Sequence, residues 1–437
     1  MNVEVRQMKT AAELSLAETF ESAKGRLPGL RALREDAFRR FEAQGLPHRR
    51  IEEWKYTDLR ALMRDAKPLA APPDAAAKAR AKDSGALLRG VNCRRLVLVD
   101  GVFAPDLSDL TAEPGVTIRG MAEALAAGDA LVARHVGKVI DTDDIAVSLN
   151  TALMGDGVVI DIAEGAAAAR PILLVYASSG RAPASMFARS LAVVGRKARV
   201  TLLESHEAAA DDQANVVTEL LVGDEAEVEH VKLVSNRDGA LQLSTLIAAI
   251  GARARFDDLT CTIGGAVTRN QLYVRYGGED TVSNLRGVSL LRGRQHADTT
   301  LVVDHAAPGC QSRELFKSVL DDDSRGVFQG RIGVQAHAQK TDAKMAAHAL
   351  LLSENAEADS KPELEIFADD VQCGHGSTAG ALDEDLLFYL RARGIPAREA
   401  EALMVTAFVG EVIEGVAHEG VREALLATTD AWLGARA

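Results

Sequence analysis

The sequence predicts a mainly β protein in which a β-solenoid is flanked by helical regions at both ends. Three observations indicate this architecture. Glycines mark a repeat of 26 to 30 residues through the middle of the chain. The repeats contain a strand-like alternation of polar and apolar residues, as in Arg199-Val200-Thr201-Leu202. Helix-type periodicity is confined to the two ends, and 437 residues leave room for a long core with flanking regions.

The glycines Gly165, Gly195, Gly223, Gly251 and Gly277 align the repeats at separations of 30, 28, 28 and 26 residues. Alanine stands three places after the first four of them, and an aliphatic residue stands eight places after all five. A single coil cannot bury its apolar face alone, so successive coils must stack. The alternative is an antiparallel β-sandwich with coincidental spacing. The aliphatic residues are Leu173, Leu203, Val231, Leu259 and Leu285.

The N-terminal region is predicted to be helical. Residues from about 11 to 44 have helix periodicity with many charges, and Gly45 and Pro47 end it. An Ala/Pro/Lys-rich passage from about 67 to 82 is typical of a linker. We therefore assign residues 1–90 to a helical region with its linker and residues 91–378 to the β-helix core, with regular coils from about 157.

Residues 379–437 are predicted to form a helical C-terminal region. Asp383 is a suitable helix cap, Gly394 ends that helix, and Pro396 suits the first turn of the next one. A final helix is expected from about 419 to 432. Such a tail either caps the open end of a solenoid or docks a partner. The second helix has one apolar stripe, made of Leu403, Met404, Ala407, Phe408 and Val412.

The composition excludes several classes of function. A net charge of −13 disfavours binding to nucleic acid or to anionic lipid. No apolar run reaches the roughly 18 residues needed to span a bilayer. The four cysteines lie far apart without Cys-x-x-Cys spacing, which is typical of a reducing compartment. The N-terminal stretch resembles neither a signal peptide nor a transit peptide. We therefore expect a cytoplasmic protein without a membrane segment.

Cys373 and His375 form the most informative pair of residues. In an extended segment, residues two apart project to the same side, so the thiol and the imidazole would lie together. Gly374 and Gly376 leave the backbone around them uncrowded. Zinc and iron–sulfur centres usually take four ligands, so this pair supplies half of a soft-metal site. A partner, or distant parts of the chain, would have to supply the other ligands.

The other cysteines and several histidines are interpreted as structural. Cys261 occupies the repeat position that Leu233 holds one coil earlier, which predicts a packed core thiol. His296 and His305 are expected to hydrogen-bond to neighbouring carbonyl groups. The remaining residues in this class are Cys310 in a turn, Cys93 at the start of an apolar strand, and His337 and His348 on the surface.

Several separate motifs, in order, resemble the SufB/SufD family of iron–sulfur cluster assembly scaffolds. The resemblance covers nearly the whole chain. The Cys-x-His-Gly pattern at 373–376 is similar to the SufD branch, because SufB-type chains flank the equivalent histidine with glutamates. The motifs lie at residues 46–59, 296–308, 328–332, 338–342, 361–371 with the Cys-Gly-His-Gly tail, and 388–395.

The resemblance implies a right-handed parallel β-helix that pairs with a SufB-type subunit. The C-terminal helical regions of both subunits would each dock one SufC-type ABC ATPase. The chain has no P-loop sequence, so ATP chemistry would come from that partner. A nascent cluster would form at the SufB–SufD interface, with His375 as its metal ligand or as a proton-handling group and Cys373 as a weaker candidate. On this basis we assign ATPase docking to Phe388, Tyr389, Leu403 and Phe408.

These expectations describe a non-enzymatic scaffold, and two alternatives stay open. One is a β-helix enzyme acting on polysaccharides, for which the carboxylates of Asp321, Asp322 and Asp323 could serve, although only 4% of the residues are aromatic. The other is an architectural partner in which His375 has no ligand role. The sequence also leaves open whether the isolated chain forms a homodimer through its β-helix edge, and whether the assembled complex binds flavin.

Overall fold

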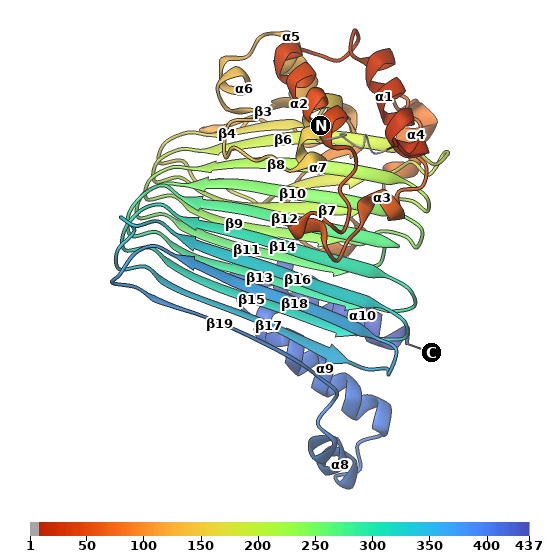
Figure 1. The fold of residues 1–437 in the computed structure, drawn as a ribbon, viewed down its shortest axis with the longest axis vertical. Coiled ribbons are helices and arrows are strands. Elements are labelled where there is room, and N and C mark those ends of the chain that lie inside the picture. The colour runs from red at the N-terminus through yellow and green to blue at the C-terminus, as the bar shows by residue number, and fades with distance from the viewer. Residues whose placement is uncertain (1–7, 437) are drawn as a thin grey trace, which may run out of the picture.

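The computed structural model describes residues 8–436, and its core consists of two facing sheets built from alternate strands (Figure 1). Sheet A has nine strands in the order β18-β16-β14-β12-β10-β8-β6-β4-β3, and sheet B has ten in the order β19-β17-β15-β13-β11-β9-β7-β5-β1-β2. All neighbouring pairs are parallel except β1 with β2 and β3 with β4. The predicted β-solenoid with helical regions at both ends is therefore confirmed, and the antiparallel sandwich is excluded.

The strands of sheet A are β3 (Val116–Gly120), β4 (Val158–Ile162), β6 (Ser185–Val194), β8 (Gln213–Val222), β10 (Leu241–Ile250), β12 (Val267–Tyr276), β14 (His296–His305), β16 (Arg325–Val334) and β18 (Glu357–Ile366). Those of sheet B are β1 (Arg94–Val99), β2 (Val102–Phe103), β5 (Ile172–Ala177), β7 (Arg199–Glu207), β9 (Glu227–Val234), β11 (Arg255–Ile263), β13 (Val282–Leu291), β15 (Gln311–Leu320), β17 (Asp342–Leu351) and β19 (Gln372–Gly380).

Helices precede the regular coils of the solenoid in the chain, and further helices follow its last strand. Before the regular coils lie α1 (Ala11–Ala23), α2 (Arg31–Gln44), η1 (Glu52–Trp54), α3 (Leu59–Leu62), α4 (Ala75–Ala81), η2 (Ala86–Leu88), η3 (Pro105–Leu107), α5 (Met121–Ala126), α6 (Ala130–His135) and α7 (Ile145–Leu153). After the solenoid come α8 (Glu384–Ala392), α9 (Ala397–Ile413) and α10 (Glu419–Gly434).

The repeated glycines lie where one coil touches the backbone of the coil before it. A Cβ atom added to Gly223 would lie 2.7 Å from the backbone nitrogen of Arg196, and one added to Gly195 would lie 2.6 Å from that of Glu164. Heavy atoms cannot approach so closely without a shift of the backbone. The glycine repeat in the sequence therefore arises because each coil stacks closely on the one before it.

The fifth repeat is offset by one residue from the predicted alignment. The corner between β12 and β13 contains five residues, 277–281, whereas the preceding corner contains four, 251–254. The glycine in close contact is Gly278, whose added Cβ would lie 2.0 Å from the backbone nitrogen of Ala252. Leu259 accordingly pairs with Arg286 and not with the predicted Leu285. The extra residue shifts every later side chain by one position.

Side chains alternate between the interior of the solenoid and its outer faces. The interior contains one apolar cluster that includes Val200, Val228 and Phe256. The outer face of sheet B packs under α9 and α10 through residues such as Leu233 and Val409. The outer face of sheet A packs under α1, η1 and α7. Both sheet faces are thus largely covered, and the two terminal strands are not.

The N-terminal region differs from the prediction in three places. The predicted helix over 11–44 is two helices, because Gly29 and Leu30 both adopt positive φ angles, of 51° and 50°, and interrupt it. The predicted linker over 67–82 contains the short helix α4. Helices α5 to α7, between 121 and 153, had no predicted counterpart.

The C-terminal helices follow the sequence signals closely. Asp383 caps α8 by accepting a hydrogen bond from the backbone nitrogen of Leu386 at 2.9 Å. Gly394 follows that helix with φ +87°, a conformation that favours glycine. Pro396 is the residue before the first turn of α9. The last helix, α10, ends two residues beyond the predicted end at 432.

We expect Gly223→Ala to destabilise the solenoid by about 2 to 3 kcal/mol, because its Cβ would meet the backbone of the preceding coil. Urea unfolding followed by circular dichroism measures this change. Gly90→Ala is the matched control, since no atom lies within 4 Å of its added Cβ, and its effect should stay within about 0.5 kcal/mol. Equal effects of the two substitutions would contradict the stacking role.

Candidate functional site

Strand β19 places Cys373 and His375 on the same side of the last coil. Cys373 pairs in register with Ala343, and His375 with Met345, both on β17. Ala343 and Met345 belong to the interior cluster, and Cys373 packs against that cluster. The two side chains therefore project to the same side of β19, as predicted, and the structure shows that this side faces the interior. Cys373 is half-buried and His375 is exposed.

These two residues lie at the open end of the solenoid. Strands β18 and β19 are the last strands of sheets A and B, so each has one edge without a neighbouring strand in the described chain. No atom lies within 4 Å of a Cβ added at Gly374, Gly376 or Gly380. The outer side of β19 is therefore open as well. A second protein can reach both the edge and the Cys373–His375 pair.

The surroundings of Cys373 favour its protonated form. Burial raises the pKa of the Cys373 thiol, a backbone hydrogen bond with Ala343 opposes the change, and the negative charges of Asp342 and Glu314 reinforce it. The thiolate is the form that binds metals. A metal ion or a nearby cation must therefore displace the proton before Cys373 can act as a ligand.

Residues 8–436 contain no group of three or more His, Cys, Asp or Glu side chains arranged to hold a metal ion. Cys373 and His375 therefore have no third side chain of this kind arranged with them within the described residues. Iron–sulfur clusters are usually held by four protein ligands. The missing donors would have to come from a second chain at the open end.

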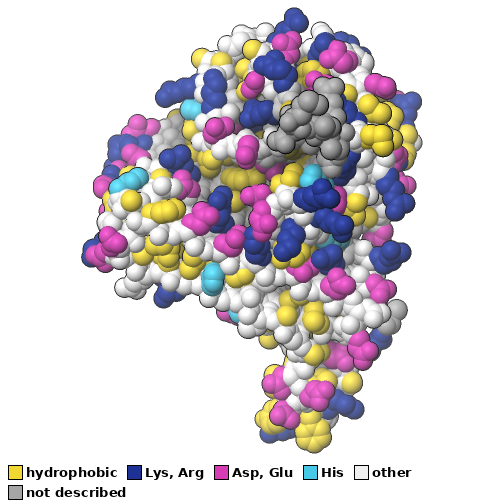
Figure 2. Space-filling model, viewed as in Figure 1, with side chains coloured by type: hydrophobic (Ala, Val, Ile, Leu, Met, Phe, Trp, Pro, Cys, Tyr) yellow, Lys and Arg dark blue, Asp and Glu magenta, His cyan; other side chains and the backbone are white. Residues whose placement is uncertain are grey.

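Helix α8 carries an exposed apolar patch on a helical projection beyond the solenoid. Figure 2 shows hydrophobic side chains gathered at the tip of this projection. Phe388 is 73% exposed and Tyr389 is 51% exposed, and no residue of α8 is buried. Leu403 on α9 is also exposed. Three of the four residues assigned to docking therefore form an accessible surface.

Phe408, the fourth of these residues, packs against the solenoid. The Nζ atom of Lys317 lies 4.4 Å from the centre of its ring and donates a hydrogen bond to its carbonyl oxygen at 2.8 Å. The Phe408 ring is half-buried against the outer face of sheet B. Phe408 thus helps to hold α9 against β15 and is less exposed than the other three residues.

The cysteines interpreted as structural are packed inside the fold. Cys261 pairs in register with Leu233 and is fully buried, and burial raises its pKa to about 12. Cys310 is also buried, and its thiol donates to the carbonyl oxygen of Gly278 at 3.2 Å. Cys93 is half-buried against the cluster that covers sheet B. None of the three lies on β17 or β19.

The histidines have structural roles, but two of them have partners other than the predicted carbonyl groups. His296 shares a hydrogen bond with the hydroxyl of Thr57 at 2.9 Å, and His305 shares one with the hydroxyl of Ser312 at 3.0 Å. His337 is exposed and His348 is half-buried on the outer face of sheet B. Thr57 lies 239 residues from His296, so local sequence could not reveal that contact, whereas Ser312 lies only seven residues after His305, across the next corner of the solenoid.

A network of charged side chains inside the solenoid had no counterpart in the sequence analysis. His230 lies 2.6 Å from Asp258, and Glu204 lies 2.8 Å from His206. Burial alone would lower the pKa of His230, but its contacts with Asp258 and Glu204 outweigh burial and raise the pKa to about 9. Lys232 is also buried in this region, where burial lowers its pKa and the charges of Glu204 and Asp258 partly oppose the change. These charges compensate one another, so the network fits a structural role.

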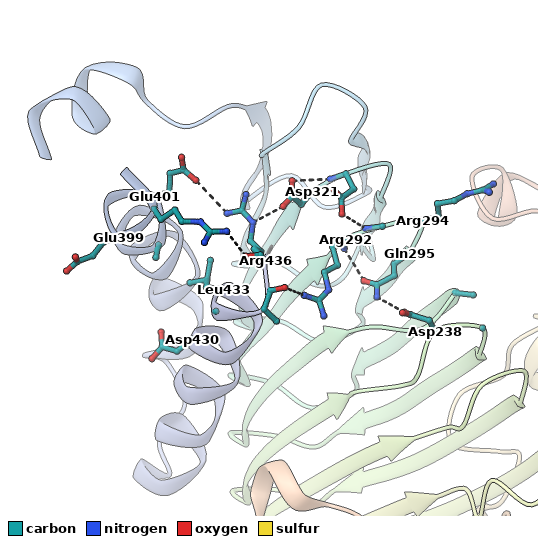
Figure 3. Close-up of a pocket in the computed structure, with 18 residues that line it drawn as sticks. Asp238, Arg292, Arg294, Gln295, Asp321, Glu399, Glu401, Asp430, Leu433 and Arg436 are labelled. Atoms are coloured by element: carbon teal, nitrogen blue, oxygen red, sulfur yellow. Dashed lines mark hydrogen bonds and ion pairs between the residues drawn. The ribbon is translucent and has the colours of Figure 1, made fainter. Parts of the chain in front are cut away.

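A cavity of about 1180 Å³ lies between the C-terminal helices and the turns of the solenoid (Figure 3). Arg436 spans it with contacts to Asp321 at 2.7 Å and to Glu401 at 3.9 Å. Arg292 donates to the carbonyl oxygen of Ala435 at 2.9 Å. These contacts hold α10 against the solenoid. Asp321 is engaged in this way, and Asp322 accepts a hydrogen bond from the backbone nitrogen of Gly293 at 2.9 Å, so two of the three carboxylates of the 321–323 run already have partners.

Sequence comparison decides the family. Residues 175–408 match the description "SUF system FeS cluster assembly, SufBD core domain", and residues 18–174 match "SufBD protein N-terminal region". The chain belongs to the SufBD family.

Three curated members of the SufBD family are similar over most of their length. The iron–sulfur cluster assembly protein SufD of Escherichia coli is 30% identical over 88% of each chain. A SufBD family protein of Synechocystis is 31% identical over 85% of this chain and 84% of its own. SufD of Bacillus subtilis is 27% identical over 65% of each chain. This SufBD protein is therefore a SufD-like protein of iron–sulfur cluster assembly. No helix among residues 8–436 is both long enough and apolar enough to cross a bilayer.

Several SufBD motifs meet at one interface on the outer face of sheet A. Trp54, from the 46–59 segment, lies 3.9 Å from the guanidinium of Arg269 and donates to Asp144 at 3.0 Å. The hydroxyl of Thr57 donates to Asp298 on β14. The side-chain amide of Gln329 on β16 donates to the carbonyl oxygen of Glu53 at 3.1 Å, and Lys361 on β18 lies 2.5 Å from Glu52. Motifs far apart in sequence thus hold the N-terminal region on the solenoid.

We expect Trp54→Ala to destabilise this SufBD protein by about 3 to 5 kcal/mol, because it removes a fully buried aromatic ring and its contact with Arg269. Trp54→Phe keeps an aromatic ring and loses the hydrogen bond to Asp144, so a cost of about 1 to 2 kcal/mol is expected. Denaturant unfolding of the two variants measures both values. A loss from Trp54→Ala no larger than that from Trp54→Phe would show that the ring does not hold the interface.

Proposed function

We propose that this SufBD protein is a non-catalytic scaffold subunit that pairs with a SufB-type subunit and builds a nascent iron–sulfur cluster at the shared interface. The observation that carries the proposal is the open end of the solenoid, where the free edges of β18 and β19 lie beside Cys373 and His375. The edge supplies the binding surface, and the two side chains supply part of the ligand set.

The free edges are suited to pairing with another β-solenoid. An exposed strand edge presents unpaired backbone N–H and C=O groups, and a partner strand can satisfy them. Ile366 and Phe367, at the end of β18 and just beyond it, are 40% and 66% exposed and add apolar surface at this end. A homodimer of the isolated chain would use the same edges, so we expect the SufB-type partner to displace it.

The chemistry of the pair favours a labile cluster. Imidazole binds iron through one ring nitrogen and is released by protonation more readily than a thiolate. A scaffold must release its cluster to an acceptor, so mixed ligation through His375 supports transfer. When a metal displaces the Cys373 proton, that proton passes to solvent or to a neighbouring group. The cluster is the cargo of the complex, and its remaining ligands come from the partner.

The exposed patch of Phe388, Tyr389 and Leu403 is the proposed docking site for a SufC-type ATPase. A projecting helix with no buried residue contributes little to the solenoid, and large exposed apolar side chains mark interaction surfaces. The sequence contains no P-loop, so the partner would bind and hydrolyse ATP. The four free cysteines fit a reducing cytoplasm, where we place this complex.

We expect His375→Ala to lower cluster content without changing assembly. The variant chain, co-expressed with SufB-type and SufC-type partners from the same source, should co-purify in the wild-type subunit ratio. Anaerobic iron and sulfide analysis should show that affinity for the cluster has fallen about 10-fold or more, because one ligand is lost. The matched control is His348→Ala, which removes a half-buried imidazole from the adjacent strand β17.

Unchanged iron and sulfide in the His375→Ala complex would leave this chain as an architectural partner only. A loss of the complex itself would show that His375 acts in assembly and not in ligation. If His348→Ala lowered the iron and sulfide content equally, the loss would not be specific to His375 on β19.

We expect a Phe388→Ser and Tyr389→Ser double variant to lose the ATPase partner while keeping the SufB-type partner. Removing two aromatic anchors should weaken docking by roughly 30-fold or more, measured by calorimetric titration with the purified ATPase. Leu14→Ser on α1 is the control, because Leu14 is 51% exposed at the opposite end of the molecule. Wild-type affinity in the double variant would place the docking site elsewhere.

A further inference from the structure

A buried carboxyl group without a hydrogen-bond donor lies beneath the open end. Glu314 on β15 is 2% exposed, and neither of its carboxylate oxygens has a hydrogen-bond partner among the described residues. Phe316, two places along the same strand, belongs to the interior cluster, so Glu314 also points inward. Such a group is costly to bury in its charged form.

The residues around Glu314 are apolar or already paired. In register with it stand Leu285 on β13 and Met345 on β17. Ala343 and Met345 of β17 lie between the Glu314 strand and β19, so Cys373 and His375 are two strands away.

The ionisable groups facing this region have other partners. The hydroxyl of Tyr276 is paired with Ser283, and His305 is paired with Ser312. The thiol of Cys310 donates to backbone oxygens, and Arg313 on the same strand is bound to Asp342 at 2.6 Å. The thiol of Cys373 and the imidazole of His375 lie beyond β17. The hydroxyl of Ser312 is engaged with His305, so among the described residues no ion pair and no well-formed hydrogen bond compensates a charged Glu314.

Burial raises the pKa of Glu314 from its ordinary value of 4.5 to about 7, and neighbouring Ser312 and Arg313 only partly oppose the change. The folded state therefore holds this proton more tightly than an opened state does. Stability contributed by the neutral acid is fully present below pH 4.5 and is lost as the pH rises toward 7. The direction is opposite to that of a carboxylate stabilised by an ion pair.

We propose that Glu314 is a conformational switch in the end of the solenoid: loss of its proton weakens the packing of β17 and β19 onto β15, so that the partner-facing end opens more readily. The position of Glu314 on β15 explains why the weakened packing affects the end of the solenoid. Only β17 and β19 lie beyond β15 in sheet B, so these strands have the fewest neighbours to hold them. The switch does not depend on His375 being a cluster ligand and goes beyond the proposed scaffold function.

Hydrogen exchange of the full chain, resolved by peptide and corrected for the intrinsic pH dependence of exchange, tests the proposal. Between pH 5.5 and pH 8, protection of the amides in β15, β17 and β19 should fall by about 10-fold or more in the wild type. Strand β4, which lies far from Glu314 in the other sheet and contains none of the buried groups of the Glu204 and His230 network, should show no such change and serves as the internal reference.

Two variants of Glu314 should abolish the pH-dependent loss of protection. Glu314→Gln removes the charge and keeps the shape. Glu314→Leu places leucine where Leu285 stands one coil earlier, so the site can accept it and the variant should also raise the melting temperature at pH 8. If one variant folds poorly, the other still decides the outcome.

His375→Ala is the matched control, because imidazole groups in general ionise between pH 5 and 8. This variant should keep the wild-type pH dependence. The proposal is overturned if the wild type shows no excess loss of protection, if the Glu314 variants keep the loss, or if the loss disappears in His375→Ala instead.

Discussion

The structure depends on the in-register stacking of backbone against backbone from one coil to the next. Each strand from β5 to β17 pairs in parallel with the strand two places later in sequence, and this pairing satisfies peptide groups of both. Glycines at one corner let the coils approach closely enough for the ladder to continue. At another position in these corners Lys197, Glu225 and Arg253 adopt left-handed conformations, with φ of 59°, 58° and 53°. The continuous ladder compensates the cost of those conformations.

A ladder of this kind must end, and the proposed site lies at its end. Helices of the N-terminal region cover the outer face of sheet A, and C-terminal helices cover that of sheet B. The last strands, β18 and β19, have nothing beyond them in the described chain. On this last strand His375 is exposed and Cys373 is half-buried. A site completed by a partner also leaves no full ligand set in the free subunit.

Buried ionisable groups in the interior of the solenoid have two kinds of surroundings. Around Glu204, His230 and Asp258, opposite charges lie within hydrogen-bond distance of one another and compensate burial. Glu314 has no such partner, and it lies close to the open end. The first arrangement fixes the middle of the solenoid. The second makes its end sensitive to proton concentration, because only the neutral acid is tolerated there.

The sequence by itself determined the repeat, the solenoid, the helical ends and the shared face of Cys373 and His375, because these features depend on local periodicity. It also determined the family, through motifs such as the 46–59 segment. Only the tertiary structure showed that this segment packs against Arg269 and Asp298, that Phe408 anchors α9, and that Glu314 has no partner. One extra residue at the corner 277–281 was enough to shift the predicted register. Contacts between segments far apart in the chain depend on how coils and helices pack. Local periodicity does not specify that packing, so the sequence alone could not predict these contacts.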